Sequence, residues 1–426
     1  MVKPRPPRPT VQFVDTYCEL YRDLFVEVRA YESFKYLQLG LISELKRKSL
    51  PAIAKVVGLK NGQGLHHFIS QSPWQACDLE KRRREIMVII DETGDKKKGE
   101  KTDYVKRQYI GNLGKIEKGI VSVNAYGYCE GMTFPLKFKI FKPKERLKEG
   151  DKYQTKPELG AELVKEIQEM GFNIKRVLAD SLYGESHSNF ISILEKLGIE
   201  YAVGIRSNHG VWLPKGQIVR ANRWRAYKNI RWNGQEETRY IREIIYGKRR
   251  EVQDWQITTD KETVPDDSTW FVMTKIPSLN YKEVGDIYKI RAYEEQGFRN
   301  SKNELGWADF RLTNYADIQK WWELVMCAYL LVCLHHDIFN PSVAPIPNCY
   351  QQHDLWDSEK GWKNQLNNLQ LILQPFICFN LILRWLKIFP IPQLSLGFPR
   401  LIAKFNDFDC LRYLVYCWHD FCYSSA

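Results

Sequence analysis

The stretch Ile86-Met-Val-Ile-Ile-Asp-Glu-Thr-Gly94 is an apolar run that ends abruptly in acidic residues. Five consecutive apolar residues predict a buried strand. The first acidic residue, Asp91, is then expected at the carboxyl end of that strand, where the sites of open α/β sheets gather. The alternative is that Asp91 only caps the helix that follows. Because side chains alternate along a strand, Glu92 should point away from Asp91 and serve the structure.

A second stretch, Ile174-Lys-Arg-Val-Leu-Ala-Asp180, repeats this pattern before the turn-forming residues Ser-Leu-Tyr-Gly. It predicts another strand that ends in a carboxylate, again with a helix cap as the alternative role for Asp180. Two such strands side by side would bring Asp91 and Asp180 together. By contrast, Asp95 lies in neither context and is expected to be a surface charge.

A third segment, residues 287–302, places four polar side chains at helical spacing. They are Tyr288, Arg291, Glu295 and Lys302. At roughly 100° per residue, the last three all fall within about 60° of Tyr288 around a helix. The four side chains are therefore expected to form one stripe.

A carboxylate flanked by two cations and a phenol suits an enzyme that holds a metal ion beside a phosphate. The neighbouring Glu294 lies about 100° from Glu295 and off the stripe, so the spacing selects Glu295. The alternative is a solvated helix face in which the charges pair along the helix.

Together these segments resemble the DDE transposases of bacterial insertion sequences, in the branch marked by a Tyr-Arg-Glu-Lys signature. The spacing of Tyr288, Arg291, Glu295 and Lys302 matches this signature residue for residue. The Asp-Glu-Thr-Gly and Ala-Asp-Ser-Leu-Tyr-Gly contexts resemble the first and second Asp blocks of the family, although Ser-Leu departs from its usual pattern. The insertion sequence 701 group is the most similar, and the resemblance covers roughly residues 45 to 340.

The resemblance implies phosphoryl transfer on DNA with two Mg²⁺ ions, for which Mn²⁺ can substitute. Asp91, Asp180 and Glu295 would be the metal ligands and the catalytic residues, and oxygen ligands suit Mg²⁺. Arg291 and Lys302 would hold DNA phosphates near the cut. Tyr288 would donate its hydroxyl to a phosphate or hold the helix of Glu295, with a packed aromatic as the alternative.

The family resemblance also implies the partners of the chain. They are double-stranded DNA, as transposon ends with inverted repeats and as target, and a second copy in a homodimer that pairs two ends. Further DNA contacts are expected from the basic residues Lys115, Arg220, Arg223 and Arg225. The alternative is that these residues form an ordinary basic surface.

The composition agrees with a polyanionic partner. The chain has 426 residues and a net charge of +12, and residues 1–85 carry 15 Lys and Arg against 9 Asp and Glu, so 15 − 9 = +6 lies there. Ten scattered Cys without Cys-x-x-Cys pairs favour reduced thiols. No signal peptide is recognised, and the apolar run at 325–334 is about half a membrane span. We therefore expect no membrane contact and a bacterial cytoplasmic, nucleoid-associated protein.

The order of elements predicts an α/β fold. Three strands followed by alternating helices and strands resemble an RNase H-like catalytic core, interrupted by a β-rich insertion and flanked by helical regions. Residues 49–58 and 64–72 form a candidate helix-turn-helix, with a plain helical hairpin as the alternative. The expected regions are a DNA-binding region at 1–85, core at 86–205, insertion at 206–285, core with the Glu helix at 286–337, and a helical C-terminal region at 338–426.

Two other functions are alternatives to that of a transposase. A transposase-derived DNA-binding protein without cleavage activity would be unaffected by Asp91→Ala. A hydrolase that uses two of the carboxylates as acid and base would need no metal, and it leaves the charge of +12 and the basic stripe unexplained. Sensitivity to a chelator separates this hydrolase from a transposase.

Overall fold

The computed structural model describes residues 5–81, 87–129, 132–172, 174–211, 213, 215–216, 218, 220–230, 235–245, 251–335, 357 and 361–406. Within these ranges it does not describe the side chains of residues 80, 81, 87, 112, 129, 132, 230, 292–295, 405 and 406. The chain divides into two compact units. One comprises Met1–Arg84 and Arg299–Ala426, and the other is Glu85–Phe298.

The unit Glu85–Phe298 is built on one mixed sheet. Its strands run in the order β2-β3-β1-β5-β6-β10-β9-β8-β7, and β4 pairs with β3 off this path. Their bounds are β1 (Met87–Lys96), β2 (Lys106–Ile110), β3 (Lys115–Cys129), β4 (Met132–Ile140), β5 (Arg176–Ala179), β6 (Glu200–Ile205), β7 (Arg225–Ile230), β8 (Glu236–Glu243), β9 (Gln253–Thr258) and β10 (Trp270–Lys275).

The centre of the sheet combines both strand directions. β1 is antiparallel to β3 and parallel to β5, and β5 is parallel to β6. The apolar Val88, Ile89 and Ile90 of β1 are fully buried, as their sequence predicts. Full burial of one such side chain contributes about 1.5–3 kcal/mol.

The prediction that the first strand ends before Asp91 is wrong, because β1 continues to Lys96. The long partner β3 sustains the ladder, with Asp91 opposite Asn124 and Lys96 opposite Gly119. Only the parallel partner β5 stops early, with Ala179 opposite Ile90. Asp95 is therefore 6% exposed inside the ladder and is not the surface charge that was expected.

The β strands of residues 206–285 continue the main sheet. β10 pairs antiparallel with β6, and β9, β8 and β7 follow outward from β10. This segment thus contains the expected strands, but they extend the sheet of the core by direct pairing. Helix α9 (Tyr281–Lys289) begins inside the same range.

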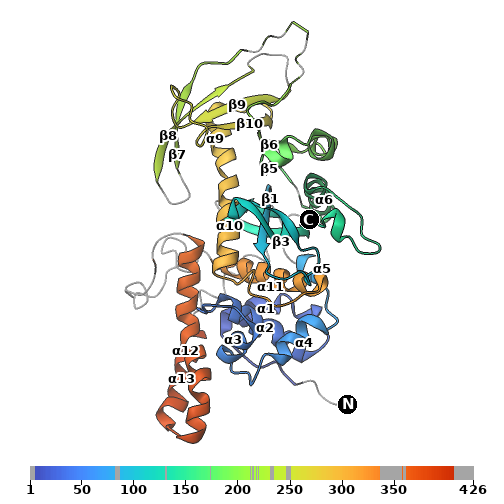
Figure 1. Ribbon diagram of the computed structural model, residues 1–426. Helices are drawn as coiled ribbons and strands as arrows, with labels where there is room; N and C mark the ends of the chain where they lie inside the picture. Colours follow the sequence, from blue (N-terminus) through green and yellow to red (C-terminus); the bar gives the residue numbers. More distant parts are fainter. Residues whose placement is uncertain are drawn as a thin grey trace. The chain divides into compact units, whose positions relative to one another are not determined.

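Helices cover the two faces of the sheet in this unit. Those of the first half are α6 (Lys156–Glu169), α7 (Ser181–Gly184), the π-helical η4 (His187–Ile191) and α8 (Ser192–Lys196). A capping box starts α6, since Thr155 and Glu158 bond each other's backbone N–H groups. Helix α9 leads through Ile290 into α10 (Arg291–Asn303). Figure 1 shows α6 and α10 on opposite sides of β1 and β3.

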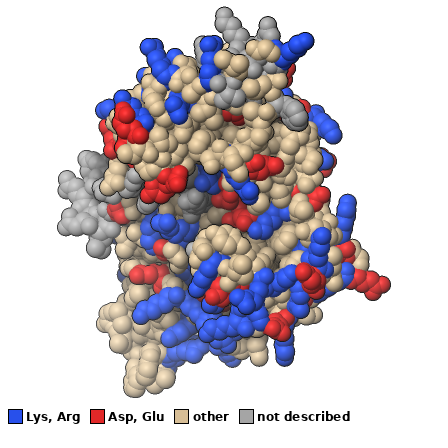
Figure 2. Space-filling model, turned by 45° about the horizontal axis from the view of Figure 1, so that its top comes forward, with Lys and Arg blue, Asp and Glu red and all other residues tan. Residues whose placement is uncertain are grey.

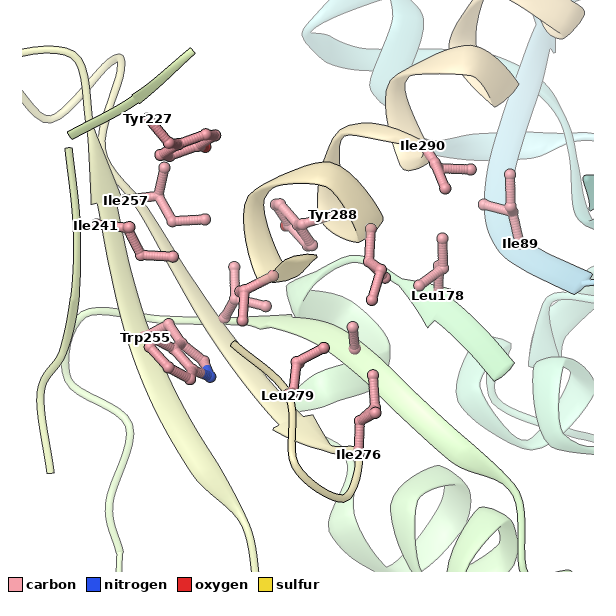
Figure 3. Close-up of a cluster of buried hydrophobic side chains, with 14 of the residues drawn as sticks. Ile89, Leu178, Tyr227, Ile241, Trp255, Ile257, Ile276, Leu279, Tyr288 and Ile290 are labelled. Carbon is pink, nitrogen blue, oxygen red and sulfur yellow. The ribbon is translucent and has the colours of Figure 1, made fainter. Parts of the chain in front are cut away.

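Residue parity along β1 agrees with this placement. Ile90 lies near Gly160 of α6, since a Cβ atom built on that glycine would be 3.1 Å from the side chain of Ile90. Ile89 instead belongs to the apolar cluster that contains Ile290 and Phe298. Figure 3 shows Ile290 directed at Ile89, with Tyr288 nearer the outer strands. Because side chains alternate along a strand, Asp91 shares the face of Ile89, which α9 and α10 cover.

The other unit is helical in its described residues. Its elements are α1 (Gln12–Glu19), α2 (Val28–Ile42), α3 (Leu50–Val56), α4 (Gln63–Ser70), α5 (Ala76–Lys81), α11 (Tyr315–Leu334), α12 (Trp362–Ile388) and α13 (Pro392–Asn406). The buried α11 lies beside α1 and α2, where Gln38 donates to Leu324 O at 3.3 Å and Tyr17 to Cys327 O at 2.7 Å. Trp321 and Trp322 are buried, as the apolar run around them predicts.

One helix of the described chain is long and apolar enough to cross a membrane. It is α12, whose 27 residues have a mean hydropathy of 1.5 in the most apolar window. This criterion rests on length and composition only. The uninterrupted apolar run at 325–334 lies in α11, whereas the apolar pattern of α12 is interrupted by polar residues and contains Pro375.

Candidate active site

Asp91 and Asp180 come together at the centre of the sheet. Ile90 of β1 pairs with Ala179, the last residue of β5, so the next residue of each strand is a carboxylate. Asp180 also caps α7, because its Oδ1 accepts the Leu182 N–H at 2.9 Å. The helix-cap alternative is thus confirmed for Asp180, and the cap fixes the orientation of this carboxylate beside Asp91.

Asn124 is a polar neighbour that the sequence analysis missed. It is fully buried on β3 directly opposite Asp91, and directly opposed residues of an antiparallel pair share a face. Its Nδ2 donates to the carbonyl oxygen of Ser122 at 3.0 Å, while its Oδ1 accepts no hydrogen bond within the described residues. The alternation of Ser122 and Asn124 with apolar residues in β3 was a sequence signal for a polar interior face.

Two residues of the predicted stripe reach the carboxylates. The Arg291 Nη1 atom lies 3.7 Å from Asp91 Oδ2. The guanidinium carbon of Arg291 lies 5.9 Å from the centre of the Tyr288 ring. Tyr288 is the second-last residue of α9 and Arg291 begins α10, so the stripe is not one uninterrupted helix. The intervening Ile290 keeps right-handed helical angles, which preserves the spacing of the two side chains.

Tyr288 is both a core residue and part of this site. Its side chain is 9% exposed and its ring lies 5.9 Å from that of Trp270. Burial raises the pKa of its hydroxyl, and the nearby charge of Arg291 lowers it. The charges of Asp180 and Asp91 raise this pKa further. The packed-aromatic alternative is therefore correct for the ring, while the hydroxyl lies among the charged groups.

The electrostatics of Asp91 reflect its crowded position. Burial raises the pKa of Asp91 to about 7, the guanidinium of Arg291 opposes this rise, and the nearby charge of Asp180 adds to it. Its Oδ1 accepts the Glu92 N–H at 2.7 Å. Two adjacent carboxylates in a poorly solvated place favour a cation between them. The oxygen donors of this pair therefore fit a hard divalent ion such as Mg²⁺.

The helix that carries Glu295 covers the face of Asp91. Phe298 contacts Tyr126 at 5.1 Å between ring centres, and a Cβ atom on Gly297 would lie 2.8 Å from the Tyr126 ring. Tyr126 lies two residues after Asn124 and on the same face of β3. The Glu295 side chain is outside the described residues, as is that of Glu294. Within the described part of the chain, no three His, Cys, Asp or Glu residues form a metal-binding group.

Glu92 makes an ion pair on the opposite face of the sheet. Lys156 Nζ, at the start of α6, lies 2.6 Å from Glu92 Oε1, and both side chains are less than one-fifth exposed. Burial raises the pKa of Glu92, the charge of Lys156 lowers it and that of Asp180 raises it. The structural role expected of Glu92 agrees with this pair, whereas Lys156 was missed because nothing in the sequence links it to Glu92.

The other basic residues that were singled out lie outside β1, β5 and α7. Lys302 lies in the last turn of α10 and belongs to the other unit. Lys115 begins β3, with its Nζ 3.4 Å from Glu117. Arg225 begins β7 and stacks on the ring of Tyr281 at 4.9 Å, and Arg220 and Arg223 are exposed just before it. Figure 2 shows Lys and Arg spread over the face turned to the viewer, interspersed with Asp and Glu.

Comparison with known proteins gives two matches of broad coverage. A family model described as DDE superfamily endonuclease matches residues 25–251. The chain is also similar to the "Probable transposase for insertion sequence element IS701" of Microchaete diplosiphon. The two are 54% identical over 354 residues, which cover 80% of this chain and 92% of the relative.

Proposed function

Because this chain belongs to the DDE superfamily endonucleases, as a transposase of the IS701 type, we propose that it moves its own insertion sequence by cutting and joining DNA. It would bind the terminal inverted repeats, cleave the DNA there and join the 3′ ends to a target. The observation that carries this proposal is the placement of Asp91 beside Asp180, under the helix of Glu295.

The ligands for the metal would be Asp91, Asp180 and Glu295. When bound, two Mg²⁺ ions would activate water or a 3′-hydroxyl and stabilise the leaving oxygen of the phosphodiester. The cap on Asp180 and the backbone bond to Asp91 hold these two carboxylates in place before binding. Glu295 would reach the same face from α10, which supplies the third ligand of an oxygen-only site.

The cations and the phenol near the carboxylates would position the DNA. Arg291 already lies 3.7 Å from Asp91, so its planar fork can bind a phosphate held at that carboxylate. Lys302, two helical turns after Glu295, would hold a phosphate farther along the strand. The Tyr288 hydroxyl would donate to a phosphate oxygen.

The remaining parts of the chain would recognise the DNA ends. We assign DNA binding to the region at 1–85, in which α3 and α4 overlap the two segments of the candidate helix-turn-helix. The strand order around β1 supports an RNase H-like core over 86–205, and we extend this core to the helix of Glu295 within 286–337. The segment at 206–285, with Arg220, Arg223 and Arg225, would contact the transposon end, as would Lys115. The region at 338–426 stays a helical C-terminal region without an assigned task.

Pairing of the two ends requires a homodimer, since each copy supplies one set of carboxylates. We place its action in the bacterial cytoplasm, on the nucleoid. The relative named above is a transposase of an insertion sequence, which supports DNA as the substrate.

The first test is the joining of a labelled, pre-cut end of the chain's own element to plasmid DNA. We expect joined product with Mg²⁺ or Mn²⁺ and none with EDTA. Ca²⁺ is the matched control, because it binds oxygen ligands with looser geometry. Tight binding of the end without joining in Mg²⁺ would instead identify a DNA-binding protein without cleavage activity.

A further inference from the structure

A half-open cavity lies in the helical unit, away from the carboxylates described above. Its volume is about 510 Å³, and it opens between the first residues of α3 and α4 and the segment 309–312. All of its lining residues belong to the unit formed by Met1–Arg84 and Arg299–Ala426. Neither the metal site nor the stripe of residues 288–302 includes any of them.

The interior of this cavity is apolar. It is lined by Leu50 and Pro51 of α3, Ile69 of α4, and Phe310, Leu312 and Trp321. The only polar atom of the Trp321 ring is bonded, because Nε1 donates to Gly306 O at 3.1 Å. A ligand in this space must therefore offer apolar or aromatic surface.

The mouth of the cavity is cationic. Arg47 and Arg311 are exposed lining residues, and among the described residues neither guanidinium has a hydrogen-bond or ion-pair partner. His66 of α4 is exposed beside them. The one carboxylate of the lining, Asp309, is engaged, because its Oδ2 accepts the Lys48 N–H at 2.6 Å. Anionic groups are thus favoured at the mouth and aromatic ones inside.

We propose that this cavity binds one unpaired nucleotide of the DNA, with its base inside and its flanking phosphates on Arg47 and Arg311. In a duplex, both faces of a paired base are covered by the neighbouring base pairs. Only an unpaired base can therefore place a face against Pro51 or Phe310. The volume suits a single nucleotide and excludes a duplex. The inference rests on the proposed DNA-binding function of this region, and it names a ligand that a helix-turn-helix alone would not take.

The test is equilibrium binding of the full chain to three labelled duplexes of the same sequence. One is fully paired, one carries a single unpaired 2-aminopurine nucleotide, and one carries an abasic site at that position. We expect the unpaired base to bind about tenfold more tightly than the abasic site, as base stacking on an apolar surface predicts. The 2-aminopurine fluorescence should change on binding.

Variants of the cavity separate this site from general DNA affinity. Leu312→Glu places a charge on the apolar wall and should abolish the preference for the unpaired base. The double variant Arg47→Ala/Arg311→Ala, at exposed positions that do not support folding, should weaken binding of the unpaired duplex more than that of the paired one. The matched control is Arg29→Ala, at another exposed arginine of the same unit, which should retain the preference.

Equal affinity for the unpaired base and the abasic site would overturn the inference, as would a preference that survives in Leu312→Glu. Loss of self-association in Leu312→Glu with unchanged DNA affinity would assign the cavity to a second copy and also overturn it. If the wild-type chain binds none of the duplexes, the proposed function fails, and the inference fails with it.

Discussion

At the scale of single residues, Tyr288 links the core of the protein to its candidate site. Its ring packs in the apolar cluster (Figure 3). The charges of Arg291, Asp180 and Asp91 act on its hydroxyl. We predict that Tyr288→Phe leaves the free energy of unfolding unchanged and lowers the rate of strand joining about tenfold. The rate falls because one hydrogen bond to a charged group is lost. Urea unfolding and joining kinetics measure the two effects. A joining rate equal to that of the wild type would show that Tyr288 has a packing role only.

The pair Glu92–Lys156 should matter for stability. Lys156→Met leaves the Glu92 carboxylate buried without its cation. We expect the free energy of unfolding to fall by roughly 2 kcal/mol, which is less than the loss of about 3–5 kcal/mol when a fully buried ion pair is broken. The double variant Glu92→Gln/Lys156→Met should recover most of that loss. Urea unfolding of the two variants tests this, and a double variant as unstable as the single one would contradict it.

The sequence predicts the site residues unevenly. Asp91 and Asp180 follow apolar runs, and this local pattern was sufficient to pair them. Asn124 lies opposite Asp91 on β3, and Lys156 of α6 pairs with Glu92 on the other face of the sheet. Both positions depend on pairing and packing between distant segments. Asp95 was misplaced for the same reason, because only the length of β3 shows that β1 continues past it.

At the scale of elements, the end of α7, the short helix that Asp180 caps, lies unusually close to β6. A Cβ atom on Gly184 would collide with the carbonyl oxygen of Gly204, a backbone atom. We predict that Gly184→Ala lowers the unfolding free energy by at least about 2 kcal/mol through this overpacking. The matched control is Gly99→Ala, where nothing lies within 4 Å. Urea unfolding of both variants is the measurement, and equal stability would contradict the close approach.

Element types were easier to predict than their connections. The helix expected at 158–170 is α6 (Lys156–Glu169), and the strand expected at 200–205 is β6 (Glu200–Ile205). The strands of 206–285 were expected as an insertion, and their alternation gave no sign that β10 would pair with β6. Pairing partners of antiparallel strands depend on contacts far apart in the sequence, which local periodicity does not encode.

At the scale of the whole molecule, the net charge of +12 should govern DNA affinity. Binding to phosphates releases counterions, so affinity should fall at least tenfold when salt rises from about 50 to about 200 mM. Fluorescence anisotropy with a labelled end of the element measures this, with KCl and potassium glutamate compared. An affinity that is independent of salt would contradict an electrostatic interface.

The central claim is that three carboxylates, Asp91, Asp180 and Glu295, perform the joining reaction. The measurement that tests it most directly is Mg²⁺-dependent joining by Asp91→Asn, Asp180→Asn and Glu295→Gln, with Glu294→Gln as the matched neighbour. We predict that each of the three lowers the rate at least about a hundredfold, while Glu294→Gln joins at nearly the wild-type rate. Full joining by any of the three, or a loss in Glu294→Gln but not in Glu295→Gln, would contradict the account.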